Sequence, residues 1–437
     1  MSEGVDTVGM DTPPRLAVDR LLDDRETRII VCCGAGGVGK TTTAAALGVR
    51  AAGRGRKAVV LTIDPARRLA QSMGIDSLDN TPRKVGTVGA GGGELHAMML
   101  DMKRTFDEIV EAHADGERAR AILANPFYQS LSAGFAGTQE YMAMEKLGQL
   151  RARDDWDLII VDTPPSRSAL DFLDAPKRLG SFLDGKFIRV LMAPAKVGGR
   201  AGMKFLNVGM SMMTGTLSKL MGASLLKDVQ TFVAAMDTMF GGFRTRADAT
   251  FRLLQAPGTA FLVVAAPEPD ALREAAYFVE RLAAERMPLA GLVLNRVHGS
   301  GADQLSAERA LAAAENLEEG GIVDQESGKA GLRDSGSEPT EPTEPAATTR
   351  TANPPETGSP GTESDTAVVD RITAGLLRLH AERMQVIARE QRTRDRFTSL
   401  HPEVAVAEVT ALPGDVHDLA GLRAIGERLA AGVPAGA

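Results

Sequence analysis

Short, mainly apolar runs recur along the chain, separated by longer segments in which apolar residues are spaced three or four apart. The short runs occupy residues 29–33, 57–63, 94–100, 157–162, 259–265, 291–295 and 404–412. Their length and their content of Val, Ile and Leu predict buried strands, while the spacing of three or four predicts helices. Strands that alternate with helices predict an α/β fold built on one doubly wound, mostly parallel sheet.

Helical spacing extends beyond the connections between strands. It continues through two long segments, residues 102–153 and 177–255, which we expect to form an inserted α-helical subdomain. Further helices are expected at residues 42–52, 367–396 and 416–430. Eight of the 18 methionines lie between Leu191 and Phe240. Methionine is flexible and polarizable, so this segment suits either a hydrophobic client of variable shape or simple filling of a core.

Two polar stretches interrupt the pattern. Residues 1–26 predict a flexible lead-in to a single domain over residues 27–437. From about 320 to 366 the chain consists largely of Glu, Pro, Thr, Ser and Gly. Such a segment buries too little apolar area to offset the entropy of folding, so we expect a disordered acidic insertion that acts as a solvated spacer.

Charge and cysteine content narrow the function classes. The formal net charge is −7, and acidic residues gather in that insertion, so the rest of the chain offers no basic face for nucleic acid. Cys32 and Cys33 are adjacent within a predicted buried strand, which favours small core residues over ligands for zinc, an iron–sulfur cluster or arsenite. The chain shows neither a signal peptide nor an uncharged run long enough to cross a bilayer, so we expect a cytoplasmic protein without an integral membrane segment.

The first predicted strand leads into a glycine-rich turn that fits the phosphate-binding loop G-x-x-x-x-G-K-[ST], from Gly34 to Thr41. Glycines let backbone N–H groups point inward at phosphate oxygens, and the helix that follows directs its positive end at the same anion. Lys40 would reach the β- and γ-phosphates, and the Thr41 hydroxyl would hold Mg²⁺. The expected nucleotide-binding residues here are Gly36, Gly37, Val38, Gly39, Lys40, Thr41 and Thr42. A strand-to-helix turn that binds nothing is the alternative.

Two aspartates close strands that would end beside this loop. Asp162 follows four apolar residues, the arrangement that brings a carboxylate to the Mg²⁺ shell. Asp64 follows a second buried run, at the strand end where open α/β sheets place their chemistry. The alternatives are an ordinary strand end for Asp162 and a helix cap for Asp64.

Taken together, these motifs resemble the ArsA-type anion-transporting ATPase family, which includes the factor that targets tail-anchored membrane proteins. The resemblance rests on the order of segments 34–42, 62–66, 161–170 and 263–268, followed by Asn295 and by a strand that stops at Pro413. In that family Asn295 falls on the residue that reads adenine, and Pro413 lies where the last strand lines the same pocket.

The resemblance also implies a catalytic centre and an assembly. Lys40 and Thr41 would bind phosphate and Mg²⁺, and Asp162 would lie near the metal. Asp64 would position the attacking water, so Asp64 and Lys40 are the expected catalytic residues. The family implies an ATP-dependent dimer with composite sites at the subunit interface.

The sequence departs from the family pattern at the position that serves the partner subunit. The family's lysine after the first glycine of the loop is Ala35 here. Its loss removes a cation from the transition state, and Arg67, Arg68 or Arg167 could replace it or could simply be solvated. The family's zinc-bridging and arsenite-binding cysteines are also missing from the sequence, which argues against arsenite transport.

Two functions follow from these residues. The first is a Mg²⁺-dependent, dimeric ATPase whose ATP cycle drives binding and release of a client protein or a small ligand, with the Met-rich segment as the client surface. The second is a nucleotide-binding regulatory subunit with low turnover, which pairs with a paralogous ATPase and is motivated by Ala35. Three other functions are weaker. The sequence lacks the base-reading motif of a GTPase, the membrane-binding segment of a partitioning ATPase and the cluster ligands of an electron carrier.

Overall fold

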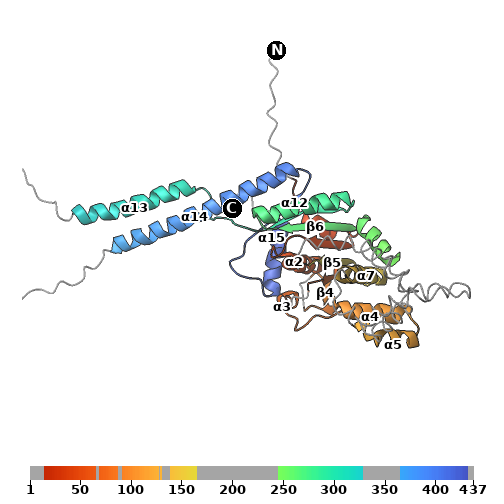
Figure 1. The fold of residues 1–437 in the computed structure, drawn as a ribbon. Helices are drawn as coiled ribbons and strands as arrows, with labels where there is room; N and C mark the ends of the chain where they lie inside the picture. Colours follow the sequence, from red (N-terminus) through yellow and green to blue (C-terminus); the bar gives the residue numbers. More distant parts are fainter. Residues whose placement is uncertain are drawn as a thin grey trace, which may run out of the picture. The chain divides into compact units, whose positions relative to one another are not determined.

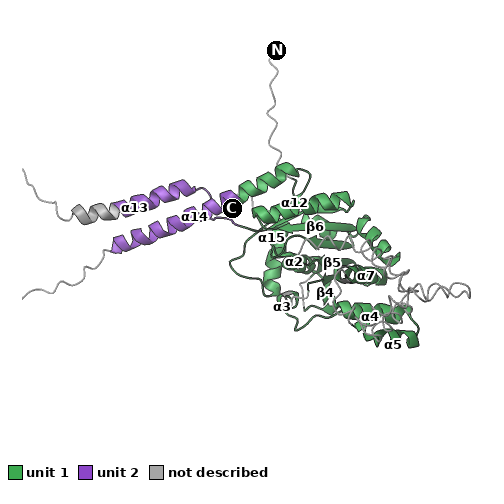
Figure 2. Cartoon of the chain, in the orientation of Figure 1, with its two compact units in different colours: residues 1–297, 390–436 green, residues 298–389, 437 purple. Residues whose placement is uncertain are grey.

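The computed structural model describes residues 14–64, 68–86, 91–126, 128–129, 138–164, 245–327 and 365–431. A mostly parallel sheet with helices on both faces dominates the larger part (Figure 1). Two compact units are distinguished: unit 1 comprises residues 1–297 and 390–436, and unit 2 comprises residues 298–389 and 437 (Figure 2). The single domain expected over residues 27–437 stays a prediction.

The sheet of unit 1 contains eight strands in the order β3-β4-β2-β5-β1-β6-β7-β8. Their bounds are β1 Ile29–Cys33, β2 Lys57–Thr62, β3 Arg83–Lys84, β4 Glu94–Met99, β5 Leu158–Asp162, β6 Thr259–Ala265, β7 Leu289–Val297 and β8 Val406–Thr410. All neighbouring pairs are parallel except β3 with β4. The predicted α/β class and the mostly parallel sheet are confirmed, while the two-residue antiparallel edge strand β3 was too short and too polar to be recognised.

Two apolar cores cover the two faces of this sheet, because successive side chains of a strand point to opposite sides. On β1, Ile29 and Val31 belong to one core, and Ile30 and Cys32 belong to the other. The described helices are α1 Val18–Asp23, α2 Lys40–Gly53, α3 Arg68–Ser72, α4 Met102–His113, α5 Gly116–Leu123, α7 Thr138–Arg153, α12 Pro269–Ala284, α13 Ala307–Ser327, α14 Asp365–Leu400 and α15 Leu419–Ala431. The first core is completed by α4, α7 and α12, and the second by α2, α3 and α15.

The segment before β1 is folded onto unit 1, so the flexible lead-in predicted for residues 1–26 is wrong for residues 14–26. Leu16 donates its N–H to the carbonyl of Val406 at 3.0 Å, and α1 buries Val18 and Leu22 completely. The carbonyl of Leu22 accepts a hydrogen bond from the buried Arg56 guanidinium at 2.8 Å. Two buried apolar residues at i and i+4 are enough to anchor this six-residue helix, but they are inconspicuous among charged neighbours.

The expected helical subdomain is described only in part. Helices α4, α5 and α7 occupy most of residues 102–153, and residues 245–255 are helical. The Met-rich segment, and residues 177–244 as a whole, lie outside the described residues.

Unit 2 contains α13 and most of α14, which lie side by side (Figure 1). Arg378 of α14 forms an ion pair with Glu318 of α13 at 2.6 Å, and a His380 ring nitrogen lies 2.7 Å from the carbonyl of Leu305. Helix α13 extends to Ser327 and α14 begins at Asp365, so both ends of the insertion expected at 320–366 are helical. Residues 328–364 lie outside the described part of the chain.

Candidate active site

Three central strands bring their carboxyl ends together. Asp162, the last residue of β5, is the register partner of Cys32 on β1 and of Thr62 on β2. The loop that follows β1 leads directly into α2, whose first residue is Lys40. The predicted phosphate loop and both predicted strand-end aspartates therefore meet at one edge of the sheet, as expected for a doubly wound α/β fold.

The loop between β1 and α2 requires glycine at specific positions. Gly34 has φ +147°, and a Cβ atom there would lie 2.0 Å from the backbone oxygen of Val264. Gly37 and Gly39 have φ +78° and +94°, in the left-handed region that costs other residues about 1–2 kcal/mol. Gly36 and Gly37 are exposed, whereas Val38 is buried. The loop thus has the strand, the glycines and the helix that a phosphate cradle needs.

Lys40 lies inside this loop rather than in solvent. Its side chain is 5% exposed, and its Nζ donates a hydrogen bond to the carbonyl of Ala35 at 2.7 Å. Burial lowers the pKa of Lys40, while the charges of Asp162 and Asp64 act in the opposite direction. A buried ammonium held by one loop carbonyl is well placed to receive phosphate oxygens as further acceptors.

Asp162 is the most deeply buried acidic group of the site. Its Oδ2 accepts hydrogen bonds from Thr41 Oγ1 at 2.7 Å and from Thr62 Oγ1 at 2.9 Å. Its Oδ1 is buried and has no hydrogen-bond partner among the described residues. Burial raises the pKa of Asp162 to about 6, although both hydroxyls and Lys40 oppose this shift.

This group of atoms fits a hard divalent cation. A hydroxyl oxygen on Thr41 adjoins a carboxylate whose second oxygen is unsatisfied, and Mg²⁺ prefers oxygen ligands of these kinds. A cation beside Asp162 would also compensate a charge that burial disfavours. The described residues contain no group of three or more His, Cys, Asp or Glu side chains that could hold a metal ion, so the fit at this site rests on the Thr41 hydroxyl and the Asp162 carboxylate.

Asp64 lies two residues beyond the end of β2 and is half-buried. Its backbone N–H donates to the Thr62 hydroxyl at 3.2 Å. Its charge raises the pKa of both Lys40 and Asp162, so the three groups share one electrostatic environment. Thr62 therefore connects the two aspartates, a role that the sequence analysis missed although Thr62 precedes Asp64 in one of the motifs.

Asn295 packs against the phosphate loop. Its Nδ2 donates to the carbonyl of Val38 at 2.9 Å, and the side chain is 7% exposed. The next residue, Arg296, has φ +63° and interrupts the β7–β8 register, a bulge of the kind that redirects side chains near functional sites. Pro413 is exposed and follows β8 by three residues. The roles of Asn295 and Pro413 toward adenine stay predictions.

The structure describes the two cysteines that the sequence singled out but not the side chains of the three candidate arginines. Cys32 and Cys33 are buried and unbonded to each other, and burial raises the pKa of the Cys33 thiol to about 12. Arg67 and Arg167 lie outside the described residues, as does the side chain of Arg68. Gln139 of α7, which no sequence pattern singled out, donates its Nε2 to the carbonyl of Ile63 at 2.9 Å, next to Asp64.

Comparison with known proteins agrees with this geometry. The sequence pattern of the family described as anion-transporting ATPase matches residues 27–319, which is more than half of the chain. The chain belongs to the anion-transporting ATPase family. The matched residues include the phosphate loop, both strand-end aspartates and Asn295.

Two relatives of this ATPase family member illustrate the extent of the likeness. ATPase GET3 of Podospora anserina is 26% identical over 298 residues, which cover 67% of this chain and 80% of that protein. ATPase GET3 of Malassezia globosa is 31% identical over 173 residues, which cover 40% of this chain and 49% of that protein.

Among the described residues, no helix combines the length and the apolar character needed to cross a membrane.

Proposed function

We propose that the protein binds and hydrolyses Mg-ATP. The observation that carries the proposal is the arrangement of Lys40, Thr41 and Asp162. At the start of α2, the Thr41 hydroxyl donates to a buried carboxylate that has one unsatisfied oxygen, and the adjacent Lys40 ammonium is buried against the carbonyl of Ala35. Membership of an ATPase family supports the same assignment.

Each residue has a distinct task in this proposal. Backbone N–H groups of residues 36–42 and the Lys40 ammonium bind the phosphates, and α2 directs its positive end toward them. Thr41 and Asp162 would hold Mg²⁺, which would neutralise phosphate charge when bound. Asp64 orients the attacking water, because a carboxylate at a strand end can accept its proton. Asn295 and Pro413 contact the adenine.

Binding and turnover are tested separately. Mg-ATP is titrated against the parent and Lys40→Ala, with thermal melting as the readout, and we expect stabilisation of the parent only. Phosphate release is then compared among the parent, Asp64→Asn and Asp76→Asn; Asp76 is an exposed aspartate that serves as the matched control. Equal release by the parent and Asp64→Asn would remove Asp64 from the mechanism, and an unshifted parent melt would remove the nucleotide site.

The nucleotide cycle is proposed to open and close a dimer that binds and releases a client. Support comes from the family and from relatives named ATPase GET3. The client is a hydrophobic protein segment or a small ligand, and the Met-rich residues are its proposed surface. Mass measurement by size-exclusion chromatography with and without Mg-ATP tests the dimer; an unchanged monomer would contradict it.

Ala35 supports a second candidate, a low-turnover regulatory subunit. This residue stands where the family resemblance expects a lysine that serves the partner's phosphates, and its side chain is buried at 8% exposure. A protein that lacks this cation would rely on a paralogous ATPase for full activity. Co-expression with such a paralogue should then yield a heterodimer of higher activity, whereas a fully active self-dimer would dismiss this candidate.

A further inference from the structure

The peptide unit that leads into Asp64 is held at both of its polar ends by side chains. Its N–H, which belongs to Asp64, donates to Thr62 Oγ1 at 3.2 Å. Its carbonyl, which belongs to Ile63, accepts a hydrogen bond from Gln139 Nε2 at 2.9 Å. Because the Cα atom of Asp64 is attached to this plane, the orientation of the plane determines where the Asp64 carboxylate starts.

The carbonyl of Ile63 lies just beyond the hydrogen-bond ladder of the sheet. The carbonyl of Thr62, the last residue of β2, still accepts from the N–H of Leu100 at 2.9 Å. The N–H of Ile63 donates to the carbonyl of Asp162 at 3.0 Å. The carbonyl of Ile63 instead accepts its hydrogen bond from Gln139, so beyond the end of β2 the backbone is held by a side chain of α7.

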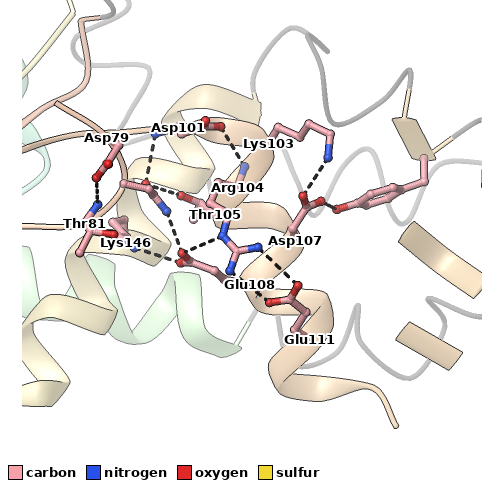
Figure 3. A network of polar contacts seen from close by, with 12 residues as sticks. Asp79, Thr81, Asp101, Lys103, Arg104, Thr105, Asp107, Glu108, Glu111 and Lys146 are labelled. Atoms are coloured by element: carbon pink, nitrogen blue, oxygen red, sulfur yellow. Dashed lines mark hydrogen bonds and ion pairs between the residues drawn. The ribbon is translucent and has the colours of Figure 1, made fainter. Parts of the chain in front are cut away.

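Gln139 belongs to α7, a helix that is anchored elsewhere by two ion pairs, each with its α7 member buried. Glu145 and Lys146 of α7 are 5% and 4% exposed. Glu145 pairs with Arg246 at 2.8 Å, and Lys146 pairs with Glu108 of α4 at 3.0 Å. Figure 3 shows Lys146 reaching Glu108 within a wider polar network on α4. Moving α7 away from these partners would leave the buried charges of Glu145 and Lys146 uncompensated, so the two contacts hold α7 in place.

We propose that Gln139 is a positioning residue for ATP hydrolysis. Through the carbonyl of Ile63 it aligns Asp64, and it makes that alignment depend on the position of α7. The inference rests on the proposed function, because Asp64 must orient the attacking water. Misplacement of a reacting group by about 1 Å can lower a rate by about 100-fold, whereas the phosphate loop is untouched by this contact. Loss of Gln139 should therefore affect turnover and leave nucleotide binding intact.

The test uses the full chain and the variants Gln139→Ala and Gln139→Glu, since a carboxylate cannot donate to a carbonyl. We expect kcat to fall at least about tenfold in both variants, with the Kd for Mg-ATP unchanged within about threefold. Gln255→Ala is the matched control, because Gln255 also donates its Nε2 to a backbone carbonyl, that of Glu285, at 2.7 Å. The control should keep the kcat of the parent. Asp64→Asn is assayed alongside. If Asp64→Asn is inactive but Gln139→Ala keeps the kcat of the parent, the positioning role of Gln139 is overturned while the proposed function still stands.

A second readout does not depend on turnover. Hydrogen exchange of the Asp64 amide is measured in the parent, Gln139→Ala and Gln255→Ala without nucleotide. We expect Gln139→Ala to exchange this amide about tenfold faster, because a peptide plane released at its carbonyl opens more often. The Ile63 amide should be unaffected, since it is bonded to Asp162. Equal Asp64 exchange in the parent and Gln139→Ala would refute the positioning role even if the parent hydrolyses ATP, whereas a parent without phosphate release would refute the proposed function.

Discussion

Asn295 near the end of β7 donates a hydrogen bond to the carbonyl of Val38 in the phosphate loop, 257 residues earlier in the chain, at 2.9 Å. A Cβ atom on Gly39 would lie 2.2 Å from the same Asn295 nitrogen. The loop is therefore supported by a side chain from another strand as well as by its own glycines.

This contact predicts unequal costs for two glycine substitutions in one loop. Gly37→Ala should destabilise the nucleotide-free protein by about 1–2 kcal/mol, because φ is +78° but a Cβ atom meets nothing within 4 Å. Gly39→Ala should cost about 1 kcal/mol more, since it also displaces the hydrogen bond of Asn295. In an Asn295→Ala background this extra cost should vanish. Urea denaturation of the single and double variants measures it, and a Gly39→Ala cost that is independent of Asn295 would refute the steric explanation.

The hydroxyl of Thr41 predicts how the protein responds to Mg²⁺. Thr41→Val removes a proposed metal ligand and one of the two donors to Asp162, so the apparent affinity for Mg²⁺ in the presence of ATP should fall at least about tenfold, or about 1.4 kcal/mol. Thr41→Ser retains the hydroxyl and should stay within about threefold of the parent. Melting temperature at fixed ATP and increasing Mg²⁺ reports this affinity. Coincident titration curves for Thr41→Val and Thr41→Ser would show that the hydroxyl is not involved.

We predict that the buried contacts of Arg56 hold the N-terminal segment, residues 14–28, in place. Its side chain is 1% exposed, pairs with Asp157 at 2.7 Å, and donates to the carbonyls of Leu22 and Thr27. Arg56→Met should cost about 3 kcal/mol or more in urea denaturation, because buried acceptors lose charged donors. It should also expose residues 14–28 to limited proteolysis.

The control for that prediction is Arg54→Met. The Arg54 side chain is 32% exposed and forms surface ion pairs with Asp19 and Asp23. Exposed pairs contribute about 0–1 kcal/mol, so this variant should remain close to the parent. A comparable loss in both variants would mean that burial of Arg56 is not what anchors the segment.

The burial of His96 should make the free energy of unfolding depend on pH. Its ring packs on Trp156 with centroids 4.4 Å apart, and burial lowers its pKa below the ordinary value of 6.5, although Glu94 opposes the shift. At a pH between the pKa of His96 in the folded chain and its ordinary value in the unfolded chain, the unfolded chain binds more protons. The free energy of unfolding therefore decreases as pH falls below about 6.5. His96→Gln should remove this component. Urea denaturation from pH 8 to 5 should show the parent losing stability relative to the variant on acidification, and a constant difference would contradict the prediction.

Much of the site could be predicted because its signals are local. Glycines, Lys40 and Thr41 are contiguous, and a run of apolar residues that ends in an aspartate identifies both Asp64 and Asp162. Parallel strands then bring these ends to one edge of the sheet as a consequence of the fold class. Periodicity could not assign residues 14–26, because one short helix with two buried residues resembles a polar tail until the apolar core that it joins is known.

The α/β class, the phosphate loop and the two strand-end aspartates could all be predicted from the sequence, since each depends on residues close together in the chain. The hydrogen bonds from Asn295 to Val38 and from Gln139 to Ile63 became visible only in the folded protein. These contacts join residues 257 and 76 positions apart through single side-chain amides. Such hydrogen bonds leave no periodic trace in a sequence, because their geometry exists only after the sheet and α7 have packed.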